Sequence, residues 1–398
     1  MQWRELPWKR IALFVVLVAL LITSLWFIFR RTRTTLPVTP PTPVQQPITG
    51  LPTAQSGAGS TVGGNTQTGN DQSGSKNTGK TIILSDYLLY APAAQGSNLI
   101  AFDQRQGAFV KIDSNGNVNP FDAFRMTNVQ GVTWSSDRTS AIVRQSDGTQ
   151  TAYNFQTKQR LTLPSTWTEV KFAANNRMVI FKNASSVGDA RWLAAGNITN
   201  GGITLLRPLG DNASSVTVAP SPDGSVAALA TIPVDGNSQN LYFIDSKGGV
   251  TEPVQIQGGF IQAQWSPSGQ WFLFSTADTT NQFKPQLWLG AGEGPNRGNH
   301  VLLPLPTTAQ QCAFAKDSTL LVCAVPSGPP QSGYGVSEGS IPGIPHTVMA
   351  IDLITGTTRT LFAPPTPSTL TTPVVTADGK TLYVTNRTTG LLESIAIP

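Results

Sequence analysis

The sequence predicts an all-β protein, specifically a seven-bladed β-propeller. The main observation is a short motif of two apolar strands around a polar turn, which recurs at intervals of 38, 48, 45, 49 and 61 residues. Its turn residues are Asp137, Asn175, Asp223, Ser268, Asp317 and Asp378. These intervals are close to the roughly 40 to 50 residues of a propeller blade. In addition, the globular part carries no apolar pattern with a 3.6-residue period, so helices are not expected there.

Each repeat continues with a second hairpin, in which strand-forming residues flank a polar or Gly-rich turn. Clear examples are 109–118, 153–161, 241–250 and 348–357. Two consecutive hairpins make a four-stranded antiparallel sheet, which is one blade. The sequence therefore predicts that every repeat is a blade.

The blade count depends on both ends of the repeat region. A first blade, with a looser turn, is expected between Tyr87 and Asp122, which gives seven in all. The last blade ends after Leu392–Ile397 and lacks one strand, and Lys80–Leu84 is expected to supply it. Strands from both termini would then close the ring and remove its free edges. Six or eight blades stay open as alternatives, because the long sixth repeat can hide an irregularity.

Three of the turns resemble those of a known family. Ser221–Gly224 reads Ser-Pro-Asp-Gly, Ser266–Gly269 reads Ser-Pro-Ser-Gly, and Ala377–Asn386 ends in Tyr-Val-Thr-Asn. These motifs are similar to the repeats of TolB-like and other WD-like (YVTN-type) bacterial propellers, over about residues 81–398. The resemblance implies a propeller fold, whereas propellers host many unrelated activities.

The N-terminal region predicts a membrane anchor. After a short segment, 1–10, residues 11–29 are apolar apart from Thr23 and Ser24. As a helix they would extend about 28 Å, which matches a hydrocarbon core of about 30 Å. Arg30 and Arg31 follow at once without a small-residue cleavage site, as expected of an uncleaved signal anchor. Residues 30–80 are rich in Pro and Thr, then in Gly and Ser, and predict a disordered linker before the propeller at 81–398.

Charge excludes one class of partner. The chain carries a net charge of +5. Residues 1–33 hold six basic groups and one acidic group, so they account for all of it. The propeller is therefore neutral, and we expect no nucleic acid partner.

The orientation of the span is not decided by charge. Three basic residues lie on each side of it, so the positive-inside rule does not discriminate. The polar linker and two cysteines that are placed to pair favour a propeller on the extracytoplasmic side of the cell membrane.

Cys312 and Cys323 flank the turn of the sixth repeat. In a simple hairpin they would lie directly opposite each other, so a disulfide is expected if this is a non-hydrogen-bonded pair. Two reduced, apolar cysteines remain the alternative. Two cysteines without a nearby histidine do not build a zinc site.

Gly335–Gly339 spells Gly-x-Ser-x-Gly, the string of the hydrolase nucleophile elbow. Its Ser337 lies in a Gly/Pro-rich loop without a following helix, and His346 and Asp352 come in the wrong order for that fold. We interpret it as a chance match and expect no catalytic residue there.

Oxygen-bearing side chains gather between residues 113 and 122. Asp113, Asn115, Asn117, Asn119 and Asp122 have the spacing of a calcium loop, but an EF-hand would need Gly at 118 and Glu at 124. A hairpin turn explains the same residues, so we expect neither a metal nor a cofactor.

The sixth repeat is lengthened by the loop Pro326–Pro345. A loop of this length inside a compact repeat is usually functional or disordered. Its apolar residues Tyr334, Ile341 and Ile344 predict that it folds over one face of the propeller and contacts a partner.

Together these features predict a membrane-anchored extracytoplasmic β-propeller that acts as a non-catalytic protein-interaction or envelope-assembly module. The partners expected are the membrane, through residues 11–29, and another envelope protein or peptide. The alternative is a glycan-active or other cell-envelope enzyme with carboxylates near the propeller axis. Its candidate residues are Asp86, Asp137, Asp223 and Asp378, which recur near blade turns.

Overall fold

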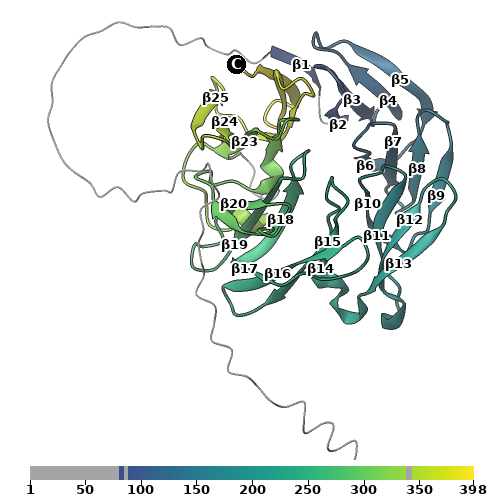
Figure 1. Ribbon diagram of the computed structural model, residues 1–398. Coiled ribbons are helices and arrows are strands. Elements are labelled where there is room, and N and C mark those ends of the chain that lie inside the picture. Colours follow the sequence, from purple (N-terminus) through teal and green to yellow (C-terminus); the bar gives the residue numbers. More distant parts are fainter. Residues whose placement is uncertain (1–79, 85–87, 338–342) are drawn as a thin grey trace, which may run out of the picture. The chain divides into compact units, whose positions relative to one another are not determined.

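The computed structural model describes residues 80–84, 88–337 and 343–398. These residues form seven four-stranded antiparallel sheets, so the predicted seven-bladed β-propeller is confirmed (Figure 1). The span expected at 11–29 and the linker expected up to residue 79 lie outside the described residues.

We number the blades in chain order, so that the closing blade is blade 7. Blade 1 contains β2 (Leu88–Pro92), β3 (Leu99–Asp103), β4 (Ala108–Ile112) and β5 (Val118–Arg125). Blade 2 contains β6 (Val129–Trp134), β7 (Ser140–Gln145), β8 (Gln150–Asn154) and β9 (Arg160–Leu163). Blade 3 contains β10 (Trp167–Phe172), β11 (Met178–Asn183), β12 (Trp192–Asn197) and β13 (Ile203–Pro208). Blade 4 contains β14 (Val216–Val218), β15 (Val226–Pro233), β16 (Ser238–Asp245) and β17 (Val254–Gln257).

Blade 5 contains β18 (Gly259–Trp265), β19 (Trp271–Ala277), β20 (Gln286–Ala291) and β21 (His300–Leu302). Blade 6 contains β22 (Cys312–Phe314), β23 (Leu320–Pro326), β24 (His346–Asp352) and β25 (Thr358–Phe362). Blade 7 contains β26 (Leu370–Val375), β27 (Thr381–Asn386), β28 (Leu391–Ala396) and β1 (Lys80–Leu84). Short helical turns lie between strands: η1 (Gly188–Ala190), η2 (Gly210–Ser215), η3 (Ala309–Gln311) and α2 (Tyr334–Ser337).

The first strand of each blade is the innermost. First strands of neighbouring blades contact one another, as β2 does with β6, and β6 with β10. Figure 1 shows β6 and β10 on the inside of the ring and β9 and β13 at its rim. Consecutive strands run up and down, so the turns between strands 1 and 2 and between strands 3 and 4 share one end of the blades, called here the turn face. The loops between strands 2 and 3 and the blade connectors share the other end, called the loop face.

The ring is closed by the N-terminal strand, as expected. β1 pairs antiparallel with β28, with Lys80 opposite Ser394 and Leu84 opposite Leu391. β1 lies beside the C-terminal end of the chain in Figure 1. The last blade therefore combines one strand from the beginning of the propeller with three from its end, so that it has four strands like the other blades.

The recurrent turn has a simple physical basis. In blade 4 the Ser221 N–H donates to the Val226 carbonyl (3.0 Å), and the Asp223 carboxylate accepts the Ser225 N–H (3.1 Å). Gly224 between them has a φ of +74°, which a side chain would disfavour. The Ser-Pro-Asp-Gly string thus satisfies the backbone of a tight hairpin by itself.

Apolar residues pack between adjacent blades rather than within one. For example, Val322 of blade 6 packs with Leu370 and Leu382 of blade 7, and all three are fully buried. Tryptophans on the strands take part in this packing. Trp134 of blade 2 makes an edge-to-face contact with Phe109 of blade 1, with ring centroids 5.4 Å apart.

Candidate functional site

The turn carboxylates proposed for catalysis are engaged in their own hairpins. Asp137 accepts the Ser135 hydroxyl (2.7 Å) and the Thr139 N–H (3.0 Å), and Asp378 accepts the Thr376 hydroxyl (2.6 Å). Asp223 accepts the hydroxyls of Ser221 and Ser225.

The surroundings of these groups keep them ionised. Burial raises the pKa of Asp137, Asp223 and Asp378, but the hydrogen bonds of the turn together lower it more, so each pKa lies below its usual value. A general acid would need the opposite shift. The fourth candidate, Asp86, lies outside the described residues.

The propeller axis is almost uncharged. Among the seven innermost strands, which the structure describes throughout, Glu169 and Lys171 are the only charged residues, and both lie on β10. Glu169 forms an ion pair with Lys182 (2.5 Å) and accepts the Val218 N–H (3.0 Å). Burial lowers the pKa of Lys171. These strands therefore do not bring two carboxylates together, as acid/base hydrolysis of a glycosidic bond requires.

The Gly-x-Ser-x-Gly residues do not form a triad. Ser337 ends the helical turn α2, and His346 begins β24, where its Nε2 lies 2.8 Å from the Tyr334 hydroxyl. Asp352 is at the far end of β24, six residues on, which is about 20 Å at the rise of a strand. There it caps the turn by accepting the N–H groups of Ile354 and Thr355.

The candidate calcium residues separate into two structural roles. Asp113 accepts the N–H groups of Asn115 and Asn117, each at 2.9 Å, and so caps the hairpin between β4 and β5. Asp122 is buried and pairs with Lys158 (2.5 Å) and the Tyr153 hydroxyl (2.8 Å). Within the described residues, no group of three or more His, Cys, Asp or Glu side chains is placed to hold a metal ion.

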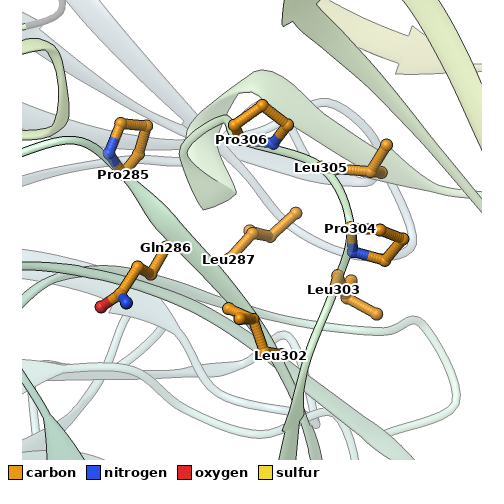
Figure 2. A pocket seen from close by; sticks show the side chains of 8 residues that line it. All are labelled: Pro285, Gln286, Leu287, Leu302, Leu303, Pro304, Leu305 and Pro306. Carbon is orange, nitrogen blue, oxygen red and sulfur yellow. The ribbon is translucent and has the colours of Figure 1, made fainter. Parts of the chain in front are cut away.

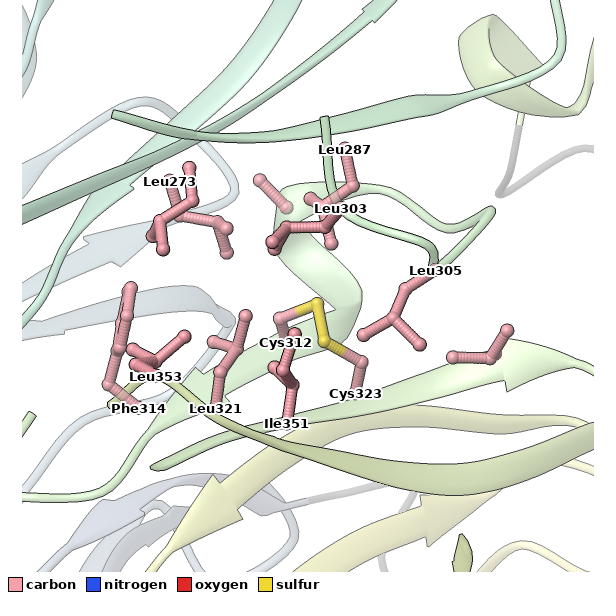
Figure 3. Packing of buried hydrophobic residues seen from close by; sticks show 13 residues of the cluster. Leu273, Leu287, Leu303, Leu305, Cys312, Phe314, Leu321, Cys323, Ile351 and Leu353 are labelled. Carbon is pink, nitrogen blue, oxygen red and sulfur yellow. A yellow bond between two sulfur atoms is a disulfide. The ribbon is translucent and has the colours of Figure 1, made fainter. Parts of the chain in front are cut away.

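Cys312 and Cys323 face each other on β22 and β23, in the register that the sequence predicts. Their Cα atoms are 4.0 Å apart and the sulfur atoms form a disulfide. Figure 3 shows it within a buried apolar cluster that includes Leu303, Leu305 and Ile351. The cross-link thus joins two strands of blade 6 beneath the connector from blade 5.

The long loop 326–345 is anchored to the loop face. The N–H groups of Gly333 and Gly335 donate to the carbonyls of Gln282 and Phe283, both at 2.8 Å. A Cβ on Gly335 would lie 2.8 Å from the Phe283 oxygen, so glycine permits this close approach. The loop of blade 6 is therefore held against the loop between β19 and β20 of blade 5.

Two of the three loop residues predicted to contact a partner serve as anchors. Tyr334 is 1% exposed and Ile344 is 9% exposed, whereas Ile341 lies outside the described residues. Instead, Val336 of the same loop exposes 56% of its surface, and Phe283 of blade 5 exposes 40%. Partner contact through this loop stays a prediction, and Val336 and Phe283 are the side chains available for it.

An apolar groove lies on the blade 5 side of this region (Figure 2). It has a volume of about 270 Å³ and is lined by Pro285, Gln286, Leu287, Leu302, Leu303, Pro304, Leu305 and Pro306. β21 ends at Leu302 and the chain then turns inward, so the beginning of β20 pairs with β19 on its inner side but has no strand on its outer side beyond Leu302. Leu302 is 53% exposed at the rim. Leu287, Leu303 and Leu305 are buried at the base, in the cluster that contains the disulfide.

Sequence patterns did not predict this groove. The signal was present as the run Leu-Leu-Pro-Leu-Pro at 302–306, which is unusually apolar for a blade connector. Because the other wall comes from residues 285–287, the groove exists only once the blades have folded.

No protein-family model matches this chain, and no curated protein matches it either. Among solved structures, hydrazine synthase of Kuenenia stuttgartiensis aligns with a TM-score of 0.50 at 15% identity, over 83% of this chain and 99% of that chain. The β-propeller domain of Cps50 (Swd1) of Myceliophteria thermophila aligns with a TM-score of 0.54 at 12% identity, over 80% and 98%. At these identities the likenesses establish the propeller fold and nothing about activity.

Within the part of the chain that the structure describes, no helix has the length and apolar character needed to cross a membrane.

Proposed function

We propose that this protein is a membrane-anchored propeller that binds another envelope protein or peptide without catalysing a reaction. The observation that carries the proposal is the apolar groove beside Val336 and Phe283. The groove and the exposed side chains near it offer a partner a place to bury an apolar anchor. The partner would insert a large apolar side chain into the groove and cover the neighbouring loop.

Several properties of the groove favour a protein over a small ligand. Its volume of about 270 Å³ is below the roughly 300 to 1,000 Å³ of typical small-molecule sites. Gln286 is the one polar side chain in its lining, so it offers few groups to orient a substrate. Pro285, Pro304 and Pro306 lack N–H groups, which disfavours addition of a strand and favours an apolar anchor.

The membrane location rests on the sequence. Residues 11–29 have the length and composition of a signal anchor, and we propose that the propeller lies on the extracytoplasmic side. The Cys312–Cys323 disulfide supports this side, because disulfides persist in oxidising compartments. Likewise, the Ser-Pro-Asp-Gly and Tyr-Val-Thr-Asn motifs support kinship with TolB-like or YVTN-type propellers, which we offer as part of the same proposal.

The binding claim is tested by site-specific photo-crosslinking of the full chain in its native membranes. A photoreactive residue at Leu302 should form an adduct with one partner. The control position is Ile354, which is 59% exposed on the turn face of blade 6. The same adduct at both positions, or none at Leu302, would refute the groove as the binding site.

The partner identified in this way then permits a measurement of affinity. Leu302→Asp should weaken its binding at least about tenfold, as expected for an interface anchor, whereas Ile354→Asp should leave it unchanged.

The topology claim needs a separate experiment. Lys247→Cys places a thiol in an exposed turn of blade 4. It should react with a membrane-impermeant maleimide in intact cells. Reaction only after lysis would place the propeller inside.

A further inference from the structure

The outer strand of blade 3, β13, has an unusually open edge. Its first four residues, Ile-Thr-Leu-Leu at 203–206, contain neither a charge nor a proline. Ile203 is 54% exposed and Leu205 is 56% exposed. An edge of this kind is a template for pairing with a further strand.

The outer strands of the other blades carry features that discourage such pairing. β5 contains Pro120, β9 begins with Arg160, and β25 contains the exposed Arg359. β17 and β21 are only four and three residues long, and β1 begins with Lys80. β13 itself ends in Arg207 and Pro208, so only its first part is open. Among the outer-strand side chains that the structure describes, β13 is distinguished by two large apolar ones, Ile203 and Leu205, that are more than half exposed.

The register of β13 determines which backbone groups are free. The Asn197 N–H donates to the Gly202 carbonyl (2.8 Å), and Thr204 lies opposite Ala195. Because hydrogen bonding alternates along an antiparallel pair, Ile203 and Leu205 direct their N–H and C=O groups away from β12. The side chains of both residues are exposed on the same strand.

Blade 4 covers the second half of β13. The Arg207 guanidinium donates to the Gly248 carbonyl (3.1 Å), and a Cβ on Gly248 would lie 2.0 Å from the Leu206 oxygen. The turn of blade 4 therefore packs against β13 from Leu206 onward. Residues 203–205 remain accessible.

We propose that β13 pairs with β13 of a second copy of this chain. In an antiparallel pair with its two-fold axis at Thr204, Ile203 lies opposite Leu205 of the second copy, and Leu205 opposite Ile203. Each copy then supplies the donors and acceptors that the other lacks, so the edge is complementary to itself. The two apolar cross-strand pairs add to this, and the open edge is uncharged, so no like charges oppose it there.

Three residues a side make a small interface, well under the roughly 1,000 Å² of a stable complex. The dimer is therefore expected to be reversible, and a covalent trap is the suitable assay. In the proposed register the two Thr204 residues form a non-hydrogen-bonded pair, whose Cα atoms are about 4.5 Å apart. That separation lies within the range that a disulfide spans.

The full chain with Thr204→Cys should form a disulfide-linked dimer on mild oxidation. Adding Leu205→Lys to this variant should reduce the dimer at least tenfold, because it places a charge at the pairing edge. The control is Lys247→Cys, which is also exposed but lies on a turn of the neighbouring blade, outside the proposed strand pair, and should cross-link only at background level. Absence of the Thr204→Cys dimer, or an equal yield from Lys247→Cys, would overturn the proposal.

A second measurement avoids engineered cysteines. Sedimentation of the unmodified full chain in detergent should show a concentration-dependent dimer that Leu205→Lys abolishes and Ile354→Lys preserves. A monomer at every concentration, or a dimer insensitive to Leu205→Lys, would count equally against pairing through β13.

Discussion

The turn face and the loop face of this propeller differ in what their residues do. On the turn face, Asp137, Asp223 and Asp378 accept hydrogen bonds from their own hairpins, so their charges stabilise the turns. The loop face of blades 5 and 6 carries the loop 326–345 and the apolar groove. The residues that form them have no counterpart in the other repeats, and several of their apolar side chains are exposed. In this chain the repeated residues specify the fold, whereas the departures from the repeat create the surface that a partner can use.

Both faces are supported by one closed ring, and removing the strand that closes the ring should unfold the propeller. Deleting Leu391–Pro398 removes β28 together with the fully buried side chains of Leu392 and Ile395. Loss of each such side chain costs about 2 to 5 kcal/mol, so the deletion approaches the whole stability of a domain, about 5 to 15 kcal/mol. Thermal unfolding should show no folded propeller. An equally long deletion at 53–60 is the control, and equal melting temperatures for both would disprove the role of the closure.

The loop face should weaken first in mild acid. Burial lowers the pKa of His346 to about 4, so the unfolded chain, with an ordinary histidine pKa near 6.5, binds the proton more readily. The resulting stability is complete above pH 6.5 and is lost as the pH falls towards 4, by about 3 kcal/mol in total. The melting temperature should therefore decline over this range.

The slope of that decline should be smaller in His346→Gln. Burial also lowers the pKa of His300, so His300→Gln is a necessary comparison, and it should reduce the slope less. An unchanged slope in His346→Gln would show that this buried histidine does not titrate on unfolding.

The Cys312–Cys323 disulfide is expected to stabilise both the propeller and the base of the groove. Replacing both Cys312 and Cys323 by alanine should lower the free energy of unfolding by about 3 kcal/mol, the usual effect of a short cross-linked loop. Because Leu303 and Leu305 pack in the same cluster, partner binding at the groove should weaken as well. Thiol labelling of the denatured, unreduced protein checks the oxidation state, and two reactive thiols would contradict the cross-link.

The smallest effect is expected on the turn face. Asp378→Ala removes the acceptor of the Thr376 hydroxyl (2.6 Å) and the Lys380 N–H (3.2 Å), which should cost about 1 to 2 kcal/mol. Partner binding should stay unchanged, because this turn is on the opposite face from the groove. Loss of binding or of an enzymatic activity without loss of stability would reverse the assignment of the two faces.

Sequence patterns predicted the fold well where the determinants are local. The turns at Asp223 and Asp378 follow from residues within one hairpin, and the missing strand of the last blade led directly to Lys80–Leu84. The pairing of Cys312 with Cys323 followed in the same way from the register of one hairpin.

Features that depend on distant segments were not predictable in this way. The groove needs residues from β20 and from the connector after β21, and nothing local indicates that they meet. The apolar character of Tyr334 suggested an exposed contact, yet its hydroxyl has a hydrogen-bonding partner in His346, twelve residues later, and the side chain is buried. Exposure depends on the tertiary structure, which composition does not reveal.

The pairing of β1 with β28 also has a consequence for synthesis. The two strands are separated by 307 residues, counted from Leu84 to Leu391. At about 5 to 20 residues per second, β1 waits roughly 15 to 60 seconds after its own synthesis before its partner exists. During that time the six other blades can form from neighbouring hairpins, but the strand Lys-Thr-Ile-Ile-Leu has no partner strand. Closure of the ring is therefore expected to be the last step of folding, after the whole chain has been synthesised.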